Sequence, residues 1–540
     1  MPKVAHLASV NTDRRASPRH KTNIALKIRR QGMLGKKILH GKIVEHSEYG
    51  AQLVVKQPLN NGDKIYLEWS NVVDARNGNA VDAAIAGKAS AVVVRQISAL
   101  NNGNNQTLRS VGVALDVDPP LRKTRLLDKL TYALLCVLFV SITANIVYLK
   151  EVNVEYFWYQ PFLNIYSLVV SFFILSRFFL AIFYRPPSDV PGYLPTVSVI
   201  VACKNEEDSI GRTLDCIYES NYPLHRMQVI AVNDGSTDRT LQEMFNAKQR
   251  NPSLMVINFE KNLGKRHGMA AGARAATGEI LVYIDSDSFV RKNTIYKIVQ
   301  GFHDESVGAV CGHADVQNAK INALTKMQDV RYYIAFRIVK AAESIFSAVS
   351  CCSGCLAAYR RSYVRPILDV WLNQTFMGQS ATFGDDRSLT NYMLRRYRVI
   401  YHAEAICATI VPETYRVFFR QQLRWKKSWI RECFIACTFM WRRHPMAAFF
   451  FYLSVIFPLM APVIVFNAVA MPIFSGTMVS FVYIYGAMLI AALSGVVYYA
   501  KHRDSVWVYG MHFTLFYMAF LVWQTYYALL TVRKNHWGTR

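Results

Sequence analysis

Two acidic clusters near the middle of the chain contain side chains that could take part in chemistry. Asp285 and Asp287 are separated by one residue, so in an extended segment their side chains point the same way. Carboxylate oxygens of this kind hold Mg²⁺ or Mn²⁺, and such an ion neutralises a diphosphate leaving group. Asp234 lies in the other cluster, residues 233–238, where it is placed to meet the base or ribose of a nucleotide. The pattern predicts chemistry on a nucleotide diphosphate.

Each cluster follows a short apolar run that is typical of a strand buried on both faces. The runs span residues 196–203, 229–232 and 280–284. The first is followed by Asn205 and Glu206, which we also assign to the binding of the nucleotide. Ligands of open α/β sheets bind at the carboxyl ends of strands, so we expect one crevice to collect all these side chains. Taken singly, Asp234 could belong to an ordinary turn and Asp285 could cap a helix.

Three further motifs follow downstream. They are Ser353-Gly354-Cys355, Gly384-Asp385-Asp386-Arg387 and Gln421-Gln422-Leu423-Arg424-Trp425. With the strands and acidic clusters, this order resembles a family 2 glycosyltransferase with a GT-A fold, and in particular processive hyaluronan, chitin and cellulose synthases. The resemblance runs from about residue 195 to 540 and includes the tail 537–540, similar to a chitin-synthase-like signature. It implies a hexosyltransferase that uses a UDP- or GDP-sugar donor and extends a growing polysaccharide.

The resemblance implies roles for the two acids of the second motif. Asp386 would be the general base that deprotonates the acceptor hydroxyl, because an inverting displacement needs one base and no enzyme nucleophile. Asp385 would assist by hydrogen bonding, although capping of a helix is an equal alternative. Both interpretations of Asp385 stay open.

The third motif predicts a single patch on a helix. Gln421, Arg424 and Trp425 stand at positions i, i+3 and i+4 and therefore share a face. Residues 416–432 mix aromatic and cationic side chains, which is typical of an amphipathic helix on the cytosolic membrane surface. By resemblance, Arg424 would hold the diphosphate and Trp425 would stack on the acceptor sugar. The alternative is that the tryptophan only anchors the helix and the cations only bind lipid.

A basic segment between the two acidic clusters is a further candidate for donor binding. Lys261 and Lys265 resemble residues that contact the donor phosphates in similar synthases, and Gly264 would allow the backbone to approach them. The alternative is a solvated surface, which is the usual place for a run of charges.

The amino-terminal part of the chain combines a basic arm with an alternating β-rich region. The arm carries Arg14, Arg15 and Arg19. Guanidinium groups suit phosphate oxygens and stack on purines, although acidic lipid is an alternative partner. Together with Ser47 and Gly50, the arm resembles the Arg-x-x-x-Arg and Asp/Asn-x-Ser-x-x-Gly signature of a PilZ domain. The resemblance implies a small β-barrel with cyclic di-GMP as an allosteric activator.

One position departs from that signature. Glu45 stands where an Asp or Asn is usual, and its longer side chain would change the contact with guanine. In similar regulated synthases the unliganded domain helps to hold a gating loop over the donor site. The resemblance implies that the ligand withdraws Arg15 and so frees this loop.

Five apolar runs are long enough to cross a membrane. They span about 130–148, 157–184, 447–474, 478–499 and 506–531. Flanking basic residues place the long soluble blocks in the cytosol. Five crossings would leave the basic tail outside, so one run is expected to be re-entrant or interfacial, or to cross twice. Arg177 interrupts the second run, and we expect its side chain to reach the cytosolic interface.

The composition also favours a membrane protein. The formal net charge of +25 suits a membrane surface or phosphorylated ligands. No helix-turn-helix pattern and no Cys/His finger spacing is visible, so a nucleic-acid partner is not expected. Cys351, Cys352 and Cys355 lack a second Cys/His pair at zinc-ribbon distance and are interpreted as packing residues.

We therefore predict a multidomain, multi-pass protein of the bacterial inner membrane whose two soluble domains are cytosolic. The predicted regions are a PilZ β-barrel at 11–118, a transmembrane hairpin at 128–185, a GT-A α/β domain at 190–415, amphipathic interface helices at 416–442 and an α-helical transmembrane bundle at 445–532. Partners would include membrane lipids and periplasmic export subunits.

Two other functions remain open at this point. One is a non-processive transferase that adds a single sugar to a lipid carrier, and the other is a cyclic di-GMP receptor with a silent transferase block. The motifs favour a product of the hyaluronan, chitin or alginate type over cellulose, but they do not identify the sugar or its linkage.

Overall fold

The computed structural model divides the chain into two compact units, Met1–Ala133 and Leu134–Arg540. Its backbone is described for residues 20–32, 35–47, 50–55, 64–69, 87–102, 106–115, 126–156, 161–476 and 481–533. Side chains are described from residue 131 onward, apart from 132, 153–154, 156–160, 477–482 and 534–540. The tail motif at 537–540 therefore lies outside the described residues.

The first unit contains a closed antiparallel barrel in the strand order β1-β2-β3-β6-β5-β4. Its strands are β1 (His20–Gly32), β2 (Gly35–Ser47), β3 (Gly50–Val55), β4 (Lys64–Trp69), β5 (Gly87–Asn102) and β6 (Gln106–Leu115). The expected small barrel is thus present. Ser47 and Gly50 face each other in the β2–β3 pair. Arg14, Arg15 and Arg19 lie outside the described residues.

The second unit is built around an eight-stranded mixed sheet in the order β11-β16-β12-β13-β10-β7-β8-β9. The strands are β7 (Val197–Cys203), β8 (Met227–Asp234), β9 (Met255–Phe259), β10 (Ile280–Ile284), β11 (Ser288–Val290), β12 (Val307–Val316), β13 (Leu356–Arg360) and β16 (Arg398–Thr409). The strands β10, β7, β8 and β9 run parallel. The three strands predicted from the apolar runs are therefore confirmed.

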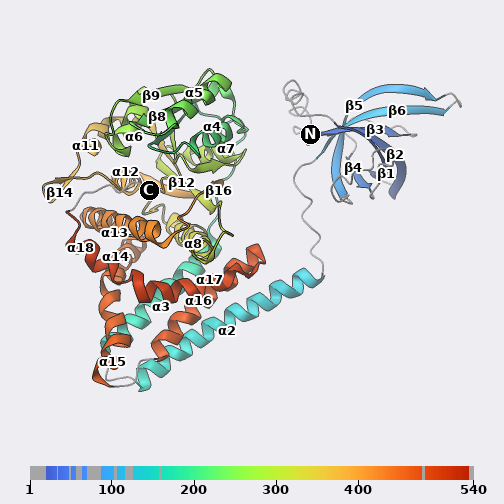
Figure 1. Cartoon of the computed structure of the whole chain (residues 1–540). Coiled ribbons are helices and arrows are strands. Elements are labelled where there is room, and N and C mark those ends of the chain that lie inside the picture. Colours follow the sequence, from blue (N-terminus) through green and yellow to red (C-terminus); the bar gives the residue numbers. More distant parts are fainter. Residues whose placement is uncertain are drawn as a thin grey trace. The chain divides into compact units, whose positions relative to one another are not determined.

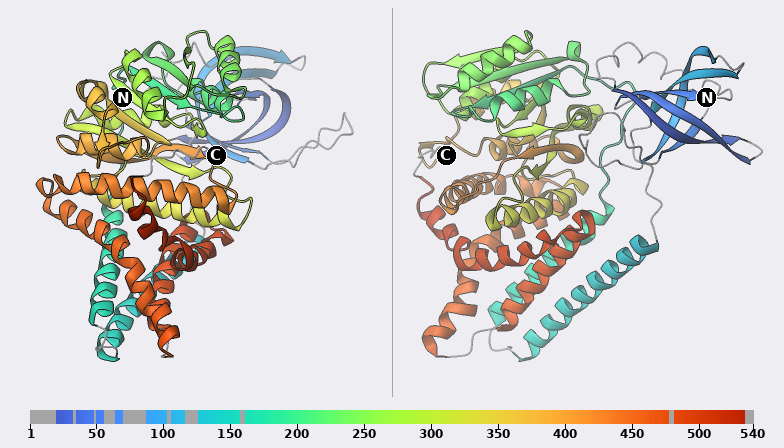
Figure 2. Two further views of the ribbon diagram at one scale, coloured as in Figure 1. Left: turned by 60° about the vertical axis from the view of Figure 1, so that its left-hand side comes forward. Right: turned by 45° about the vertical axis from the view of Figure 1, so that its right-hand side comes forward.

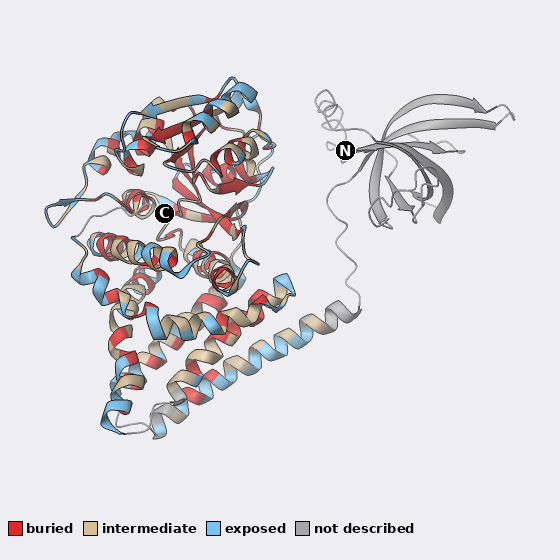
Figure 3. Cartoon of the chain, in the orientation of Figure 1, coloured by how far each residue is buried: buried red, intermediate tan, exposed pale blue. Residues whose placement is uncertain are grey.

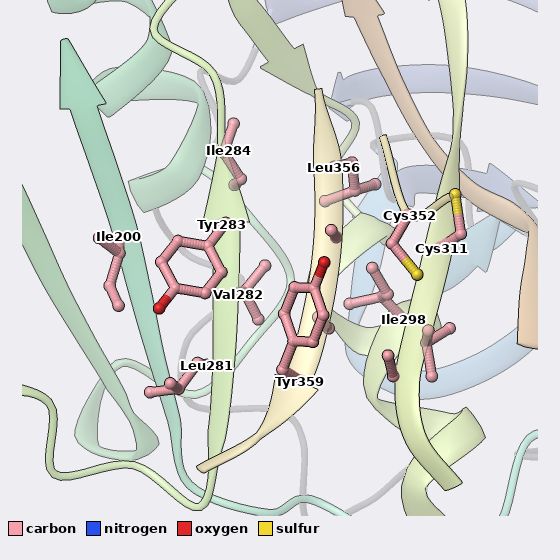
Figure 4. Packing of buried hydrophobic residues seen from close by; sticks show 14 of the residues in the cluster. Ile200, Leu281, Val282, Tyr283, Ile284, Ile298, Cys311, Cys352, Leu356 and Tyr359 are labelled. Carbon is pink, nitrogen blue, oxygen red and sulfur yellow. The ribbon is translucent and has the colours of Figure 1, made fainter. Parts of the chain in front are cut away.

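Helices cover this sheet and bury the apolar strands. They are α4 (Ile210–Tyr218), α5 (Thr240–Arg250), α6 (Lys265–Ala275), α7 (Thr294–Gln300) and α12 (Asp385–Leu394). Every residue of β7 and β10 is buried, which explains their unbroken apolar sequences (Figure 3). The rings of Tyr283 and Tyr359 meet edge to face across β10 and β13, with centroids 5.8 Å apart (Figure 4).

Smaller elements complete the part of this unit that surrounds the sheet. They are α8 (Ala323–Ile334), the π-helix η4 (Ala335–Lys340), α9 (Ala341–Ile345), α10 (Arg361–Val364), α11 (Leu368–Leu372), the hairpin β14 (Thr375–Phe376) and β15 (Gln379–Ser380), and the short 3₁₀ turns η2 (Leu224–Arg226), η3 (Gly301–His303) and η5 (Arg365–Ile367). The long helix α13 (Tyr415–Cys437) lies between the sheet and the apolar helices (Figures 1 and 2).

Four helical segments of the described chain are long and apolar enough to cross a membrane. They are Ala133–Val152, Pro161–Phe183, Pro445–Ser475 and Tyr483–His502. They fall in α2 (Leu126–Tyr156), α3 (Pro161–Phe183), α14 (Pro445–Val465) with its continuation η7 (Phe466–Ala470) and α15 (Met471–Ser475), and α16 (Phe481–His502). Their outward apolar side chains are exposed, as expected of surfaces that contact lipid (Figure 3).

The fifth apolar run differs from the other four. Ser505–Leu521 and Gln524–Leu530 are bent by 42° against each other, so the pair is either one broken span or a re-entrant loop. The segment comprises η8 (Ser505–Val508), α17 (Tyr509–Phe516), η9 (Tyr517–Leu521) and α18 (Gln524–Leu530). It packs on α8 and α13. If the pair does not cross the membrane, four spans remain. An even number of crossings no longer leaves the basic carboxyl-terminal tail outside.

Arg177 does not extend along the lipid surface as expected. It is 5% exposed and its guanidinium lies 4.6 Å from the ring of Phe173 and 4.2 Å from that of Phe450. Stacking on aromatic faces stabilises a guanidinium in an apolar surrounding. Packing between α3 and α14 therefore replaces the predicted snorkelling.

Candidate active site

The predicted crevice residues do gather at the carboxyl ends of parallel strands. Asp234 is the last residue of β8 and is buried. Its Oδ1 accepts a hydrogen bond from the Leu263 amide at 2.7 Å, and its Oδ2 accepts one from the Gly264 amide at 2.9 Å. Burial raises the pKa of Asp234, and these two donors oppose that rise. The carboxylate thus fastens the loop that begins α6.

This loop presses closely on the turn after β8. Gly235 has a φ of 62°, and a Cβ atom there would lie 2.4 Å from the carbonyl carbon of Lys261. Only glycine fits this turn. Lys261 itself is exposed. Lys265 is the first residue of α6 and is half-buried. The two predicted donor-binding lysines therefore have different surroundings.

Asn205 and Glu206 form the edge of the crevice beyond β7. Asn205 has a φ of 54°, and its Oδ1 accepts a hydrogen bond from the Thr237 amide at 2.9 Å. The amide of Glu206 donates to Thr240 Oγ1 at 2.7 Å. A positive φ in a non-glycine residue marks a backbone held in place by its surroundings. These contacts tie the β7 loop to the β8 loop.

Lys265 partly compensates the negative charge of Asp285 and Asp287, the acidic pair after β10. Lys265 Nζ contacts Asp285 Oδ1, and both side chains remain partly exposed. Burial disfavours the charged lysine, but the carboxylates of Asp285, Asp385 and Asp287 outweigh it and raise the pKa of Lys265. Asp287 Oδ1 also accepts a hydrogen bond from Thr409 Oγ1 at 3.4 Å. The charges of both carboxylates therefore act on Lys265.

The donor set at this point fits a metal ion that the substrate helps to hold. No group of three or more His, Cys, Asp or Glu side chains converges within the part of the chain that the structure describes. Mg²⁺ is usually bound by one or two carboxylates together with substrate phosphates, which matches a site with only Asp285 and Asp287. A Cβ on Gly354 would lie 3.0 Å from Asp285 Oδ2, so glycine keeps this carboxylate accessible.

A buried ion pair joins α6 to α12. Arg266 Nε lies 2.7 Å from Asp385 Oδ1, and both side chains are almost fully buried. The same guanidinium donates to the carbonyl of Trp371 at 3.0 Å and to Gln374 Oε1 at 3.2 Å. Asp385 thus holds α12 against α6. The structure gives it a contact that neither of the two sequence interpretations contained.

Asp386 is the next residue of α12 and lies at the surface of the site. Its Oδ1 accepts a hydrogen bond from the Arg387 amide at 2.8 Å, and its Oδ2 lies 3.5 Å from Cys351 Sγ. The carboxylate is therefore adjacent to the loop of residues 351–355, which also reaches Asp285 through Gly354. The predicted base and the predicted metal ligand border the same loop.

Helix α12 rests directly on α13. Gly384 caps α12 with a φ of 80°, and a Cβ there would lie 1.8 Å from Ser428 Oγ. Glu432 of α13 accepts hydrogen bonds from Asn391 Nδ2 at 3.0 Å, and Arg431 of α13 contacts the carbonyl of Phe383. These contacts fix the distance between the acids of α12 and the helix that carries Gln421, Arg424 and Trp425.

Helix α13 packs against other parts of the protein as well as exposing apolar side chains. Phe418 packs among Leu324, Met327 and Leu521. Lys426 Nζ contacts the carbonyl of Leu521 and donates to Thr525 Oγ1 at 2.9 Å. Its apolar face and several of its cations are therefore used inside the protein. Helix α13 therefore bridges the sheet and the last apolar helices, and its position at the membrane surface stays a prediction.

The third motif lies on this bridge. Gln421 and Arg424 are half-buried, Trp425 is 38% exposed, and Gln421 Oε1 is a buried acceptor with no hydrogen-bond partner among the described residues. Buried polar atoms without a partner are uncommon in proteins. An unsatisfied acceptor beside an exposed tryptophan suits a site that receives hydroxyl groups.

Two supporting residues were not identified from the sequence. They are Arg266 and Lys340. Lys340 is buried and contacts the carbonyl of Cys351, Ser353 Oγ at 3.0 Å and Cys311 Sγ at 3.3 Å. It holds the loop next to Asp386. Neither position has a local sequence signal, because their partners lie far away along the chain.

Comparisons with known proteins agree with this geometry. Residues 198–368 match Glycosyl transferase family 2. A hyaluronan synthase of Streptococcus pyogenes is 27% identical over 407 residues, which cover 74% of this chain and 96% of that protein. An N-acetylglucosaminyltransferase of Rhizobium meliloti (strain 1021) is 34% identical over 299 residues, or 53% of this chain and 69% of that protein.

A solved structure was also found at greater distance. The mannosyltransferase of Pyrobaculum calidifontis, determined with GDP-Man and Mn²⁺, has 22% identity and a TM-score of 0.45 over 72% of this chain and 99% of that chain. The sequence relatives, the sheet and its acidic edge, and the apolar helices show that this chain is a membrane-associated glycosyltransferase that belongs to glycosyl transferase family 2.

Proposed function

We propose that the protein is a processive, inverting polysaccharide synthase of the bacterial inner membrane. It would transfer sugar units from a UDP- or GDP-sugar to a growing chain, move that chain across the bilayer, and be activated by cyclic di-GMP. The catalytic and barrel domains would face the cytosol. The named functions of the relatives support polymer synthesis, and the site supports the chemistry as follows.

Asp386 is the residue we assign as general base. Its carboxylate takes the proton of the acceptor hydroxyl while the hydroxyl oxygen bonds to the anomeric carbon. The bond from that carbon to the diphosphate breaks, and the nucleoside diphosphate leaves with the electron pair. One displacement inverts the anomeric configuration. Asp385 serves as a positioning residue through its ion pair with Arg266.

The donor is assigned to the crevice between β7, β8 and β10. Asp234, Asn205 and Glu206 would line the nucleotide, while Lys261 and Lys265 would contact phosphate. Asp285 and Asp287 would hold Mg²⁺ or Mn²⁺, which supplies positive charge to the leaving diphosphate. Lys265 neutralises Asp285 before the donor binds, because the two side chains are already in contact.

The connection between α12, α13 and the apolar helices carries the processive part of the proposal. Gly384 beside Asp386 packs on Ser428 of α13, and Lys426 of the same helix bonds to Leu521 and Thr525. One helix therefore links the proposed base with the membrane-associated bundle. A polymer that leaves the acceptor side past Trp425 would move along this helix toward the bilayer.

The direct test is product analysis. Purified full-length protein would be incubated with Mg²⁺, cyclic di-GMP and one UDP- or GDP-sugar at a time, and the product would be sized and subjected to linkage analysis. We expect long polymer from one donor. A product of a single sugar on a lipid carrier would support the non-processive alternative, and absence of any donor turnover would refute the synthase.

The regulatory part rests on the barrel and the sequence signature around it. Ser47 and Gly50 pair at the junction of β2 and β3, and the arginines of the arm precede β1. Calorimetric titration of the full-length protein with cyclic di-GMP should show binding that Arg19→Ala weakens. Full activity without the nucleotide together with an unaffected Arg19→Ala variant would refute this activation.

A further inference from the structure

A second cationic site lies where the catalytic domain meets the first turn of α14. It is an open hollow of about 560 Å³ whose polar lining comprises Ser347, Arg398, Arg442, Arg443 and His444. None of its lining residues is acidic, and none belongs to the donor or acceptor site proposed above. The hollow is therefore a separate concentration of positive charge.

The charge of this hollow is compensated only in part. Arg398 pairs with Asp304 outside the lining. Arg442 and Arg443 form no ion pair with a carboxylate among the described residues. Burial and the nearby Arg398 charge lower the pKa of Arg443, as expected for guanidinium groups held close together. An anion between them would relieve this repulsion.

Two of the three arginines of the hollow are held in place by hydrogen bonds. Arg398 donates from Nε and Nη2 to Ser347 Oγ at 3.0 and 2.9 Å, and Arg443 Nη2 donates to the carbonyl of Tyr397 at 3.0 Å. Ser347 has a φ of 52°, which is uncommon for a non-glycine residue and costs free energy. Hydrogen bonds thus fix the guanidinium groups of Arg398 and Arg443, while that of Arg442 lies over the ring of Trp441, 4.8 Å from its centroid. Guanidinium groups suit phosphate oxygens.

The position of the hollow indicates the source of the anion. Arg177 of α3 stacks on Phe450 of α14. Helix α3 ends six residues after Arg177, at Phe183, and His444 stands six residues before Phe450. The ends of the two spans therefore lie at about the same level. His444 immediately precedes the membrane span Pro445–Ser475, so the hollow lies at headgroup level.

Apolar side chains continue from the hollow toward the span. Trp441 is 60% exposed, Met446 42% and Phe449 47%. Phe346 forms one wall, with its ring stacked on His444 at 4.9 Å. Tryptophan is enriched at the membrane interface, and exposed apolar side chains beyond it suit acyl chains. A soluble phosphate compound would make no use of them.

We propose that this hollow binds the phosphate of an anionic phospholipid, with Arg442 and Arg443 on the phosphate and the acyl chains along Trp441, Met446 and Phe449. The site is independent of the polysaccharide proposal, because its residues touch neither the donor crevice nor the acceptor loop of residues 351–355. It adds a lipid ligand of defined charge to a membrane enzyme.

The test is binding of a short-chain lipid to the full-length protein in detergent, measured by native mass spectrometry. Dioctanoyl phosphatidylglycerol should bind more tightly than dioctanoyl phosphatidylcholine and than glycerol 3-phosphate. Arg442→Gln should weaken phosphatidylglycerol binding by about fivefold, the effect of one basic residue near an anionic surface. Arg442→Lys, which keeps the charge, should retain most of the affinity.

Arg185→Gln is the matched control. Arg185 is also exposed and follows directly on a span, but it bonds only to the carbonyls of Ile182 and Tyr184. An equal loss of affinity in Arg185→Gln would overturn the site, and equal binding of glycerol 3-phosphate would overturn the lipid assignment. If Arg442→Gln did not fold, wild-type binding that did not weaken between about 0.05 and 0.3 M salt would also overturn it.

Discussion

Two pairs of adjacent residues, Lys265-Arg266 and Asp385-Asp386, show a division between chemistry and scaffold. Lys265 is partly exposed against Asp285, whereas Arg266 is buried against Asp385. Asp386 is likewise half-buried at the site, while Asp385 is buried. In each pair one charge is partly exposed and the other is buried in the ion pair that joins α6 to α12. Chemically similar neighbours therefore have different surroundings.

The difference between exposed and buried charges shows how the side chains of a polar site can be kept in position. The exposed charges must remain free to change partners when a donor and an acceptor bind. The buried charges cannot, because an unpaired ion in the protein interior is costly. The buried pair consequently sets the position of the exposed pair, and each side of this comparison can be tested separately.

The largest effect is expected at Asp386. Asp386→Asn keeps the size of the side chain but removes its capacity to accept a proton, so synthesis should fall by about 10²- to 10⁴-fold. Polymer formation with the preferred donor measures this, and the thermal unfolding temperature should not change. Asp369→Asn, at an exposed carboxylate paired with Arg274, should leave both quantities unaltered. Synthesis above a tenth of wild type in Asp386→Asn would contradict the assignment.

Loss of the buried Arg266–Asp385 ion pair should lower the stability of the protein more than loss of an exposed ion pair. Arg266→Met leaves the Asp385 carboxylate buried and unpaired, which should lower the free energy of unfolding by about 3–5 kcal/mol. Denaturant or thermal unfolding of the purified protein in detergent measures it. Arg274→Met is a matched control on the same helix: the Arg274–Asp369 pair also spans 2.7 Å but is exposed, and its loss should cost at most about 1 kcal/mol. Equal losses would show that burial does not separate the two pairs.

A smaller loss of stability is expected where α12 meets α13. Gly384→Ala places a Cβ against Ser428 and imposes a left-handed φ on alanine, so it should destabilise the protein by about 1–3 kcal/mol. Gly378→Ala provides the control, because Gly378 has a similar φ of 75° but no atom within 4 Å of its Cβ position. The difference between their unfolding temperatures isolates the contact with Ser428. No difference would mean that the helices can separate without cost.

The smallest effect is expected at Lys261. This side chain is exposed, so Lys261→Gln should raise the KM for the donor by about threefold, the range of a solvent-exposed charge contact, and leave kcat unchanged. Lys265→Gln should reduce kcat as well, because Lys265 contacts Asp285. Steady-state kinetics across donor concentrations distinguish the two. If both variants behaved alike, the distinction between an outer and an inner lysine would be wrong.

Much of the fold could be predicted because its signals are local. The apolar runs around Val199, Ile230 and Val282 became buried parallel strands, and the acidic residues that follow them lie at one edge of the sheet. The helical spacing of Gln421 and Trp425 also correctly predicted a helix. Periodicity and turn chemistry involve neighbours along the chain, so they can be read without a structure.

The surroundings of these elements could not be predicted in the same way. The amphipathic pattern of α13 fits a membrane surface as well as a protein interior, and it does not reveal that Phe418 packs in one cluster with Leu521. Arg177 is similar, since a lone cation in an apolar run does not reveal the rings that cover it. The 42° bend in the last apolar segment is likewise not visible in its hydropathy.

The sequence by itself determined which residues can do the chemistry: carboxylates after buried strands, a pair of acids that begins a helix, and a cationic and aromatic face. Only the tertiary structure decided which member of each adjacent charged pair is partly exposed at the site and which is buried in the Arg266–Asp385 ion pair. The physical reason is that ionic contacts depend on distance in space, and Arg266 and Asp385 are separated by more than a hundred residues of chain.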